Sequence, residues 1–283
     1  MTVPTHDVPT HTLHDGTSLP AIGFGTAMLN GPRGVEAMVS ALDEGYRLLD
    51  TAFSYENEGA VGEAVRRSSV PREDIVVSTK LAGRHHAHDG AVDAVHESLY
   101  RTGLDYLDLV LVHWPNPSKD LYVEAWEALV ELQLLGVVRS IGVSNFLPEH
   151  LDRLVSETGV TPVVNQIELH PYFPQADQRA ADARLDVRTE SWSPLGRASD
   201  VLDEPVIREI AHAHGKTVPQ VILRWHVQLG SVPLPKATSP ERQRENIAIF
   251  DFALSDDEMG RITALGRPDG RTNDQDPAVY EET

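Results

Sequence analysis

Short apolar runs alternate with longer amphipathic stretches along this chain. The runs are rich in Val, Ile and Leu, which is typical of buried strands, whereas apolar residues recur every three or four positions in the stretches between them, which is typical of helices. The clearest predicted strands are 75–79, 107–112, 140–143, 163–167 and 232–234, weaker ones lie at 21–24, 47–49 and 186–190, and the predicted helices include 35–44, 91–102, 121–135 and 219–229.

This alternation predicts an α/β fold with a parallel sheet, because parallel neighbours are joined by right-handed helical crossovers. About eight strand–helix units follow one another, and no Ser/Gly-rich or Pro-rich linker interrupts them. We therefore expect one (β/α)8 TIM barrel domain over residues 1–283. A doubly wound sheet is the alternative, but its GxGxxG fingerprint is missing, since Gly23-Phe24-Gly25 is followed by Thr26-Ala27-Met28.

Two further local signals lie before and after these units. An Asp15-Gly16 turn with short alternating flanks predicts a β-hairpin over about residues 11–20. Near the other end, Ser255 precedes three acidic residues, a pattern that predicts an N-cap followed by a last helix.

Composition and charge exclude several classes of function. The 283 residues contain no cysteine, which excludes disulfides, thiolate catalysis and cysteine-bound zinc. A net charge of -19 argues against nucleic acid or an anionic membrane as the main partner, so an anionic ligand would need a local basic cluster. The sequence has neither a secretory-type start nor a run near the ~18 apolar residues of a membrane span. We expect a cytoplasmic monomer that acts on a small molecule.

Polar or aromatic residues stand where the predicted strands end. In a barrel of this kind, the carboxyl ends of the strands meet at one mouth, which is where active sites lie. Taken singly, Asp50 could cap a turn, Lys80 could reach solvent and His113 could be a buried histidine. Their agreement across many strands favours a shared site instead, formed by Asp50, Lys80, His113, Ser144, Asn145, Gln166, Trp192, Ser193 and Lys236.

The motifs at these positions resemble those of the aldo-keto reductase superfamily, with the bacterial 2,5-diketo-D-gluconate reductase type as the nearest likeness. The resemblance runs in order from about Gly23 to Met259 through "DTAFSYENE", "STKL", "LVLVHWP", "IGVSNF", "VNQIELHP", "SWSPLG" and "LPKATSPERQRENIAIFDFALSDDEM". It implies a barrel closed at its bottom by the N-terminal hairpin, and an oxidoreductase that reduces aldehydes and ketones with NADPH and without metal. It also implies a catalytic tetrad of Asp50, Tyr55, Lys80 and His113.

The chemistry of the tetrad is consistent with that implied reaction. A carbonyl that accepts hydride becomes an alkoxide and needs a proton donor, for which Tyr55 is the candidate. A tyrosine has an ordinary pKa of ~10, and we expect the Lys80 ammonium to lower it. Asp50 would keep that buried ammonium charged. His113 would orient the carbonyl by a hydrogen bond and is placed to assist its protonation.

The resemblance also places the cofactor. Ser144, Asn145 and Gln166 would hold the nicotinamide carboxamide, and the ring would lie on Trp192. The remaining implied cofactor contacts are Thr26, Asp50, Ser193, Leu195, Lys236, Thr238, Arg242, Glu245 and Asn246. The resemblance implies NADPH as the cofactor. Because Ala237 replaces a serine that is common in the family, one phosphate donor is missing, and we expect NADH to serve as a weaker substitute.

The substrate mouth would be lined by Ala27, Tyr55, Ala82, His113 and Trp114. Many family members have large aromatics at the first and third of these positions, so we expect a more open mouth here. This holds unless the C-terminal segment, about residues 266–283, folds over it around Pro277 and Tyr280.

Two alternative functions remain from the sequence. One is a cofactor-binding regulatory protein on the same barrel, with little turnover. The other is a metal-dependent hydrolase that uses the histidines of residues 84–88, although these lack a carboxylate at a fixed helical spacing.

Overall fold

The computed structural model describes residues 8–283, and its centre is a parallel sheet. Each strand of this sheet pairs with the next one along the chain, so the spatial order follows the sequence order within the described residues. The eight strands of the described part are β3 (Phe24–Gly25), β4 (Leu48–Asp50), β5 (Val76–Leu81), β6 (Leu107–Val112), β7 (Val138–Ser144), β8 (Val164–Glu168), β9 (Arg188–Trp192) and β10 (Val232–Pro233).

Two backbone hydrogen bonds close this sheet on itself. Gly23 N donates to Pro233 O at 3.0 Å and Gly25 N donates to Pro235 O at 3.1 Å, which joins the first strand of the barrel to the last. A Cβ on Gly25 would stand 2.9 Å from the Leu234 carbonyl oxygen, so glycine is what allows this close approach. The predicted (β/α)8 barrel is confirmed.

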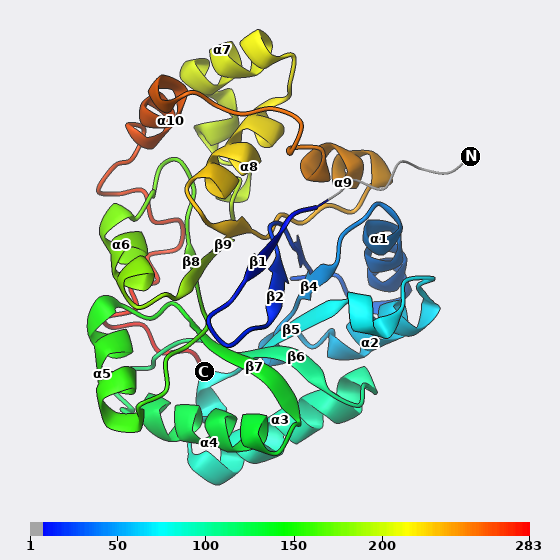
Figure 1. Cartoon of the computed structure of the whole chain (residues 1–283), viewed down its shortest axis with the longest axis vertical. Helices are drawn as coiled ribbons and strands as arrows, with labels where there is room; N and C mark the ends of the chain where they lie inside the picture. Colours follow the sequence, from blue (N-terminus) through cyan, green and yellow to red (C-terminus); the bar gives the residue numbers. More distant parts are fainter. Residues whose placement is uncertain (1–7) are drawn as a thin grey trace.

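Helices surround the strands (Figure 1). Each predicted helix is present with bounds shifted by a few residues, and Ser255 caps α10 as predicted, with Glu258 N donating to its hydroxyl at 3.3 Å. The helices are α1 (Gly31–Asp43), α2 (Glu58–Arg67), α3 (His88–Thr102), α4 (Tyr122–Leu134), α5 (Pro148–Thr158), α6 (Ala176–Arg184), α7 (Pro205–His214), α8 (Val218–Gln228), α9 (Pro240–Ile247) and α10 (Asp256–Thr263).

The predicted hairpin is formed by β1 (Thr10–Thr12) and β2 (Ser18–Pro20), which pair antiparallel. It lies across the amino-terminal ends of the barrel strands, in dark blue in Figure 1. Ser140, early in β7, donates to Asp15 Oδ2 at 2.8 Å, and the His14 Nε2 atom lies 3.1 Å from the carbonyl oxygen of Pro162, just before β8. The hairpin therefore closes the bottom of the barrel and leaves the opposite end as the mouth.

The predicted strand 186–190 is shifted by two residues in the structure. Asp186 has a φ of 57°, a left-handed conformation that ends the turn after α6 and cannot continue into a strand. The strand β9 therefore begins at Arg188 and ends at Trp192, so that this tryptophan stands at the mouth.

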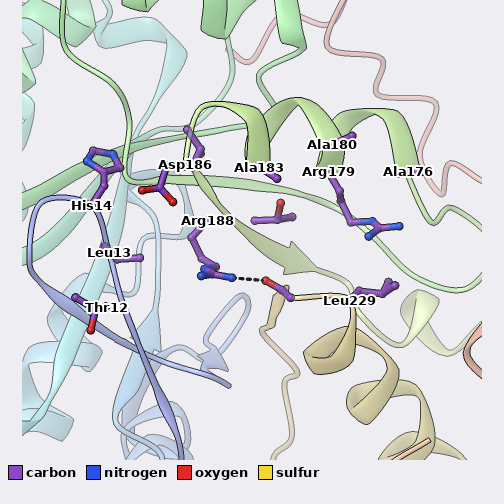
Figure 2. Close-up of a pocket in the computed structure, with 13 residues that line it drawn as sticks. Thr12, Leu13, His14, Ala176, Arg179, Ala180, Ala183, Asp186, Arg188 and Leu229 are labelled. Carbon is purple, nitrogen blue, oxygen red and sulfur yellow. Dashed lines mark hydrogen bonds between the residues drawn. The ribbon is translucent and has the colours of Figure 1, made fainter. Parts of the chain in front are cut away.

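A cavity of about 380 Å³ lies at the hairpin end of the barrel, between the hairpin, α6 and β9. Figure 2 shows Arg179 and Arg188 among its lining residues, and Arg188 Nη1 donates to the Gly230 carbonyl at 2.9 Å. Since this cavity lies beside the amino-terminal ends of the strands, it is at the opposite end of the barrel from Asp50, Lys80 and His113. We assign it no part in the chemistry below.

Two expectations concern the chain outside the barrel. Within residues 8–283 there is no helix of the length and apolar character that a membrane crossing requires. The expected lack of a secretory signal concerns the first residues of the chain, and residues 1–7 lie outside the described range.

Candidate active site

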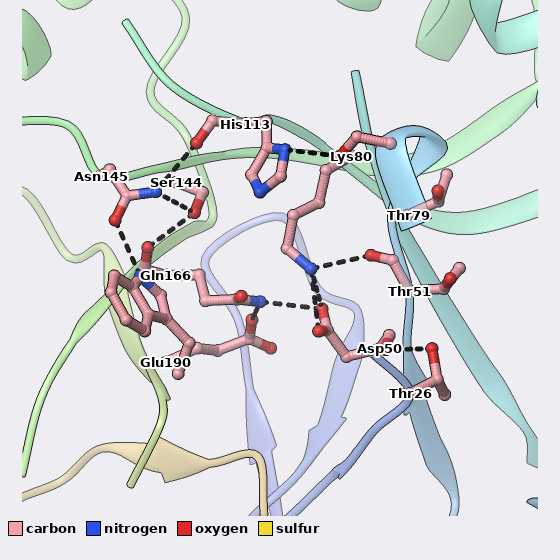
Figure 3. A network of polar contacts seen from close by, with 12 residues as sticks. Thr26, Asp50, Thr51, Thr79, Lys80, His113, Ser144, Asn145, Gln166 and Glu190 are labelled. Carbon is pink, nitrogen blue, oxygen red and sulfur yellow. Dashed lines mark hydrogen bonds and ion pairs between the residues drawn. The ribbon is translucent and has the colours of Figure 1, made fainter. Parts of the chain in front are cut away.

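Asp50 and Lys80 form a buried ion pair at the mouth (Figure 3). Asp50 ends β4 and Lys80 lies in β5, so neighbouring strands bring the two side chains together. Lys80 Nζ donates to both carboxylate oxygens of Asp50 at 2.8 Å and to the Thr51 carbonyl at 2.7 Å, and its side chain is 0 % exposed. Burial alone would lower the pKa of Lys80, but the surrounding acidic groups, Asp50 foremost, together outweigh burial and raise the pKa, which keeps the ammonium charged.

Tyr55 lies beside this pair, in the short 3-10 helix η1 (Phe53–Tyr55) that follows β4. The Lys80 Nζ atom is 5.2 Å from the centre of the Tyr55 ring. Burial raises the pKa of the phenol above its ordinary value, and the nearby Lys80 charge, which lowers it, offsets only part of this effect. Lys80 therefore acts in the expected direction, but the pKa of the phenol is raised overall rather than lowered, because the desolvation of a buried phenol is the larger effect. Tyr55 keeps its proton in this site.

His113 directly follows β6, and its ring meets Tyr55 edge to face, with 6.1 Å between the ring centres. The Nδ1 atom of His113 lies 2.7 Å from Oε1 of Glu282 and 3.5 Å from the Ser54 hydroxyl. The structure thus brings Asp50, Tyr55, Lys80 and His113 together, as the sequence predicts. Glu282 was not among the predicted site residues, and no motif around it marks it as one.

A second buried carboxyl group, Glu190 in β9, lies behind the ion pair. Gln166 Nε2 donates to Asp50 Oδ1 and to Glu190 Oε2, both at 2.9 Å, and so links the two acids (Figure 3). Burial, together with the charge of Asp50, raises the pKa of Glu190 to about 8. Glu190 is not among the residues predicted from the sequence, although an acid inside an otherwise buried strand is a signal that could have identified it.

This raised pKa predicts a pH-dependent stability. Because Glu190 binds its proton more tightly in the folded protein than at its ordinary pKa of 4.5, its contribution to stability falls as pH rises from 4.5 to about 8. Each unit by which the pKa differs between the folded and unfolded states corresponds to ~1.4 kcal/mol in the free energy of unfolding. We expect Glu190→Gln to gain in unfolding free energy relative to the wild type between about pH 5 and about pH 8, measured by urea denaturation. Glu36→Gln, exposed on α1, controls for the loss of one charge; parallel curves for wild type and Glu190→Gln would contradict this assignment.

Ser144, Asn145 and Trp192 form a connected polar group at the mouth. Asn145 Nδ2 donates to the His113 carbonyl and to the Ser144 hydroxyl oxygen, both at 3.0 Å, and its Oδ1 accepts from Trp192 Nε1 at 2.8 Å. Asn145 has a φ of 63°, which asparagine tolerates better than most residues. Asn145 therefore links the indole of Trp192 to the backbone of His113.

The predicted cations of the cofactor site are exposed. Lys236 Nζ donates to the Ala27 carbonyl at 3.0 Å, and neither Lys236 nor Arg242 has an ion-pair partner within residues 8–283. Ser239 caps the start of α9 next to them, and its hydroxyl accepts from Arg242 N at 3.4 Å. The remaining predicted contacts comprise buried Thr26 and Asn246, half-buried Ser193, Leu195 and Glu245, and exposed Thr238.

The substrate side of the mouth is covered rather than open. The C-terminal segment (residues 266–283) folds over it, with 4.5 Å between the ring centres of Tyr280 and Trp114. Ala82 is 0 % exposed within the main core cluster, and the space beside Gly83 is filled by the Asn116 side chain. The gap expected at Ala82 is therefore absent, because Asn116 and the C-terminal segment occupy this side of the mouth, which is the exception that the sequence analysis allowed for. Ala27 is half-buried.

The histidines of residues 84–88 have separate surroundings. His85 packs edge to face on Phe53, with 5.0 Å between ring centres, and His88 Nε2 lies 3.3 Å from a Glu131 carboxylate oxygen. His86 is buried, and neither of its ring nitrogens has a hydrogen-bond partner in the described part of the chain. Within residues 8–283 no three His, Asp or Glu side chains are grouped as a metal site would require.

Comparison with known proteins identifies the family of this chain. The model of the aldo/keto reductase family matches residues 21–267. The chain is 52 % identical to the 2,5-diketo-D-gluconic acid reductase B of Corynebacterium sp., over 98 % of this chain and 99 % of that protein. It is 45 % identical to the methylglyoxal reductase DkgA of Salmonella typhimurium, over 95 % of this chain and 96 % of that protein.

Solved structures show the same fold. An aldo/keto reductase from Brucella melitensis superposes with a TM-score of 0.88 at 45 % identity, covering 91 % of this chain and 99 % of that one. A Bombyx mori aldo-keto reductase in complex with NADP superposes with a TM-score of 0.89 at 33 % identity, covering 97 % and 98 %. The barrel and its mouth thus define an oxidoreductase of the aldo-keto reductase type. The chain belongs to the aldo/keto reductase family.

Proposed function

We propose that this protein reduces aldehydes and ketones to alcohols with NADPH, using Tyr55 as the proton donor. The observation that carries the proposal is the buried group of Asp50, Lys80 and Tyr55 with His113 against the phenol ring. A proton donor, a charged neighbour and a hydrogen-bonding imidazole at one mouth are what a carbonyl oxygen needs when it gains negative charge.

The residues at the mouth fit NADPH. The side-chain oxygen Oε1 of Gln166 accepts no hydrogen bond within residues 8–283, so it is available to an amide N–H such as that of a carboxamide. Lys236 and Arg242 have no ion-pair partner in the described part of the chain and lie beside the start of α9, where an anion is favoured, so they would hold the ribose phosphate by charge-assisted hydrogen bonds. NADPH, when bound, supplies the hydride.

The remaining residues donate the proton, stabilise the phenolate that is left and orient the substrate. Tyr55 keeps its proton until an alkoxide, which is far more basic than a phenolate, accepts it. Lys80 then stabilises the phenolate that remains, and Asp50 holds the ammonium in place. His113 orients the carbonyl oxygen towards the phenol. The buried position of the group excludes water and strengthens each of these interactions.

The substrate class follows from the relatives. Their names describe reduction of a diketo sugar acid and of methylglyoxal, both of which carry adjacent or multiple carbonyl groups. We infer that dicarbonyl compounds and keto-sugars are the first substrates to test, followed by α-ketoesters and aryl aldehydes. A kcat/KM panel with NADPH tests this ranking; steady NADPH consumption also excludes a regulatory protein without turnover, whereas no consumption with any carbonyl contradicts the proposed function.

The phosphate-binding role of Lys236 gives a separate prediction. We expect Lys236→Ala to weaken NADPH binding on the order of tenfold or more, because a charged hydrogen bond contributes ~1.5–3 kcal/mol. The same variant should change NADH binding little, because NADH lacks the phosphate. Fluorescence titration of both cofactors measures the two dissociation constants. Arg244→Ala is a matched control, since Arg244 carries the same charge on α9 but is paired with Glu44; equal losses for both cofactors in Lys236→Ala would place Lys236 outside the phosphate site.

A further inference from the structure

Glu282 is fixed against the catalytic mouth by several contacts at once. Its Oε1 lies 2.7 Å from His113 Nδ1, and its Oε2 accepts from Gly83 N at 2.9 Å. Its backbone is held as well, because Glu282 N donates to Asn116 Oδ1 at 3.0 Å and Asn116 Nδ2 donates to the Glu282 carbonyl at 2.7 Å. The side chains of His113 and Glu282 are only 11 % and 9 % exposed. These contacts attach the C-terminal segment to the site through both the side chain and the backbone of Glu282.

The contact determines which protons the His113 ring carries. An ionised carboxylate can only accept hydrogen bonds, so the Nδ1 atom that faces it must carry a hydrogen. A neutral imidazole has a single N–H, which would leave Nε2 as an acceptor that cannot donate to a carbonyl oxygen. His113 can therefore satisfy Glu282 and donate to a substrate only when both ring nitrogens are protonated. A carboxylate at 2.7 Å stabilises that cation by a charge-assisted hydrogen bond.

The other charges near the ring are compatible with this ion pair. Burial raises the pKa of Glu282, but the hydrogen bond and charge of His113, together with the hydrogen bonds from Gly83 and Ser54, outweigh burial, so that the pKa lies below its ordinary value and the carboxylate stays ionised. Burial lowers the pKa of His86 to about 4, so this neighbour is uncharged near neutrality. The groups that face His113 are Tyr55 and Ser54 from η1, with the Lys80–Asp50 pair behind the phenol, His86 from the turn before α3, and Glu282 from the C-terminal segment.

We propose that Glu282 is a positioning residue of the reaction, which holds the His113 ring doubly protonated and so makes Nε2–H available to the substrate carbonyl. This inference rests on the proposed carbonyl reduction. It assigns a role to a residue of the C-terminal segment that lies outside the motifs and acts through His113 alone. The neutral variant Glu282→Gln keeps the size of the side chain and its ability to accept from Gly83 N, but it removes the charge.

The test is a double-mutant cycle with a pH profile. We expect Glu282→Gln to lower kcat for reduction ~10-fold or more, because the variant loses a hydrogen bond between charged groups. The dissociation constant for NADPH should not change. The pH dependence of its kcat/KM should differ from that of the wild type, because the amide carries no charge to pair with the His113 ring. In a His113→Gln background the same substitution should have no further effect, as both partners of the interaction are then changed. Glu281→Gln is the matched control, since Glu281 accepts from Ser118 N instead.

Nitrogen-15 NMR of the His113 ring in the wild-type protein, assigned with His113→Gln, gives a measurement that does not depend on the folding of a Glu282 variant. We expect both ring nitrogens to carry a proton while Glu282 is in contact with the ring. A neutral ring, an unchanged pH profile in Glu282→Gln, or an equal loss in both backgrounds would each overturn the proposal. If none of the carbonyl compounds tested makes the wild type consume NADPH, the proposed function itself fails. The NMR result still reports on the ion pair between His113 and Glu282 in that case.

Discussion

Replacing Tyr55 with phenylalanine should lower kcat for carbonyl reduction ~10²–10⁴-fold, the range over which general acid catalysis usually contributes. The substitution removes only the phenol hydroxyl and leaves the ring against His113, so NADPH should bind as in the wild type. Since the buried Tyr55 retains its proton, the hydroxyl is the group that the alkoxide would otherwise use. Steady-state kinetics with a dicarbonyl substrate and a fluorescence titration of NADPH measure the two quantities.

A second tyrosine serves as the control for this variant. Tyr122 lies on α4, and its hydroxyl contacts Arg153 at 3.3 Å, so Tyr122→Phe removes a hydroxyl from outside the Asp50–Lys80 group. We expect that control to retain its kcat. If Tyr55→Phe also retained a kcat near that of the wild type, Tyr55 would not be the proton donor.

Replacing Lys80 with methionine should damage both folding and turnover. The substitution leaves Asp50 buried beside Gln166 with no cation, and breaking a buried pair in this way typically costs ~3–5 kcal/mol. We expect a loss of this size in the free energy of unfolding by urea denaturation, and a loss of kcat comparable to that of Tyr55→Phe, because no cation remains to stabilise the phenolate.

The double variant Lys80→Met with Asp50→Leu separates these two effects. Removing the unpaired carboxylate should recover much of the stability, since a buried ion pair can often be replaced by apolar residues of similar size. It should recover none of the activity. A Lys80→Met protein as stable and as active as the wild type would show that the pair has neither role.

The sequence predicts the barrel and the polar residues at the strand ends from local patterns, whereas Tyr55 and the tetrad as a set are implied by the resemblance to the family. Each strand is an apolar run, and Asp50 and Lys80 come at or near the ends of two such runs, so adjacency in the sheet is enough to bring them together. The hairpin likewise follows from its Asp15-Gly16 turn. The helix bounds and the start of β9 shift by a few residues, since caps and left-handed positions such as Asp186 depend on the backbone conformation.

The remaining features of the site arise from burial and long-range packing. Tyr55 has a raised pKa because desolvation outweighs the charge of Lys80, and the depth of a side chain is not a local property of the sequence. Glu282 reaches His113 only because the C-terminal segment folds back over the mouth, held on the way by Thr272, whose hydroxyl donates to Glu168 at 2.6 Å. The same segment covers the mouth where missing aromatics predicted a gap.

The most direct test of the account is to follow the hydride. The purified protein would be incubated with methylglyoxal and NADPH carrying deuterium at the transferable position of the nicotinamide, and the product alcohol analysed by mass spectrometry. We expect one deuterium on the new carbinol carbon, one NADP⁺ formed for each alcohol, and loss of the product in Tyr55→Phe. Consumption of NADPH without deuterium in an alcohol, or equal product from Tyr55→Phe, would contradict carbonyl reduction at this site.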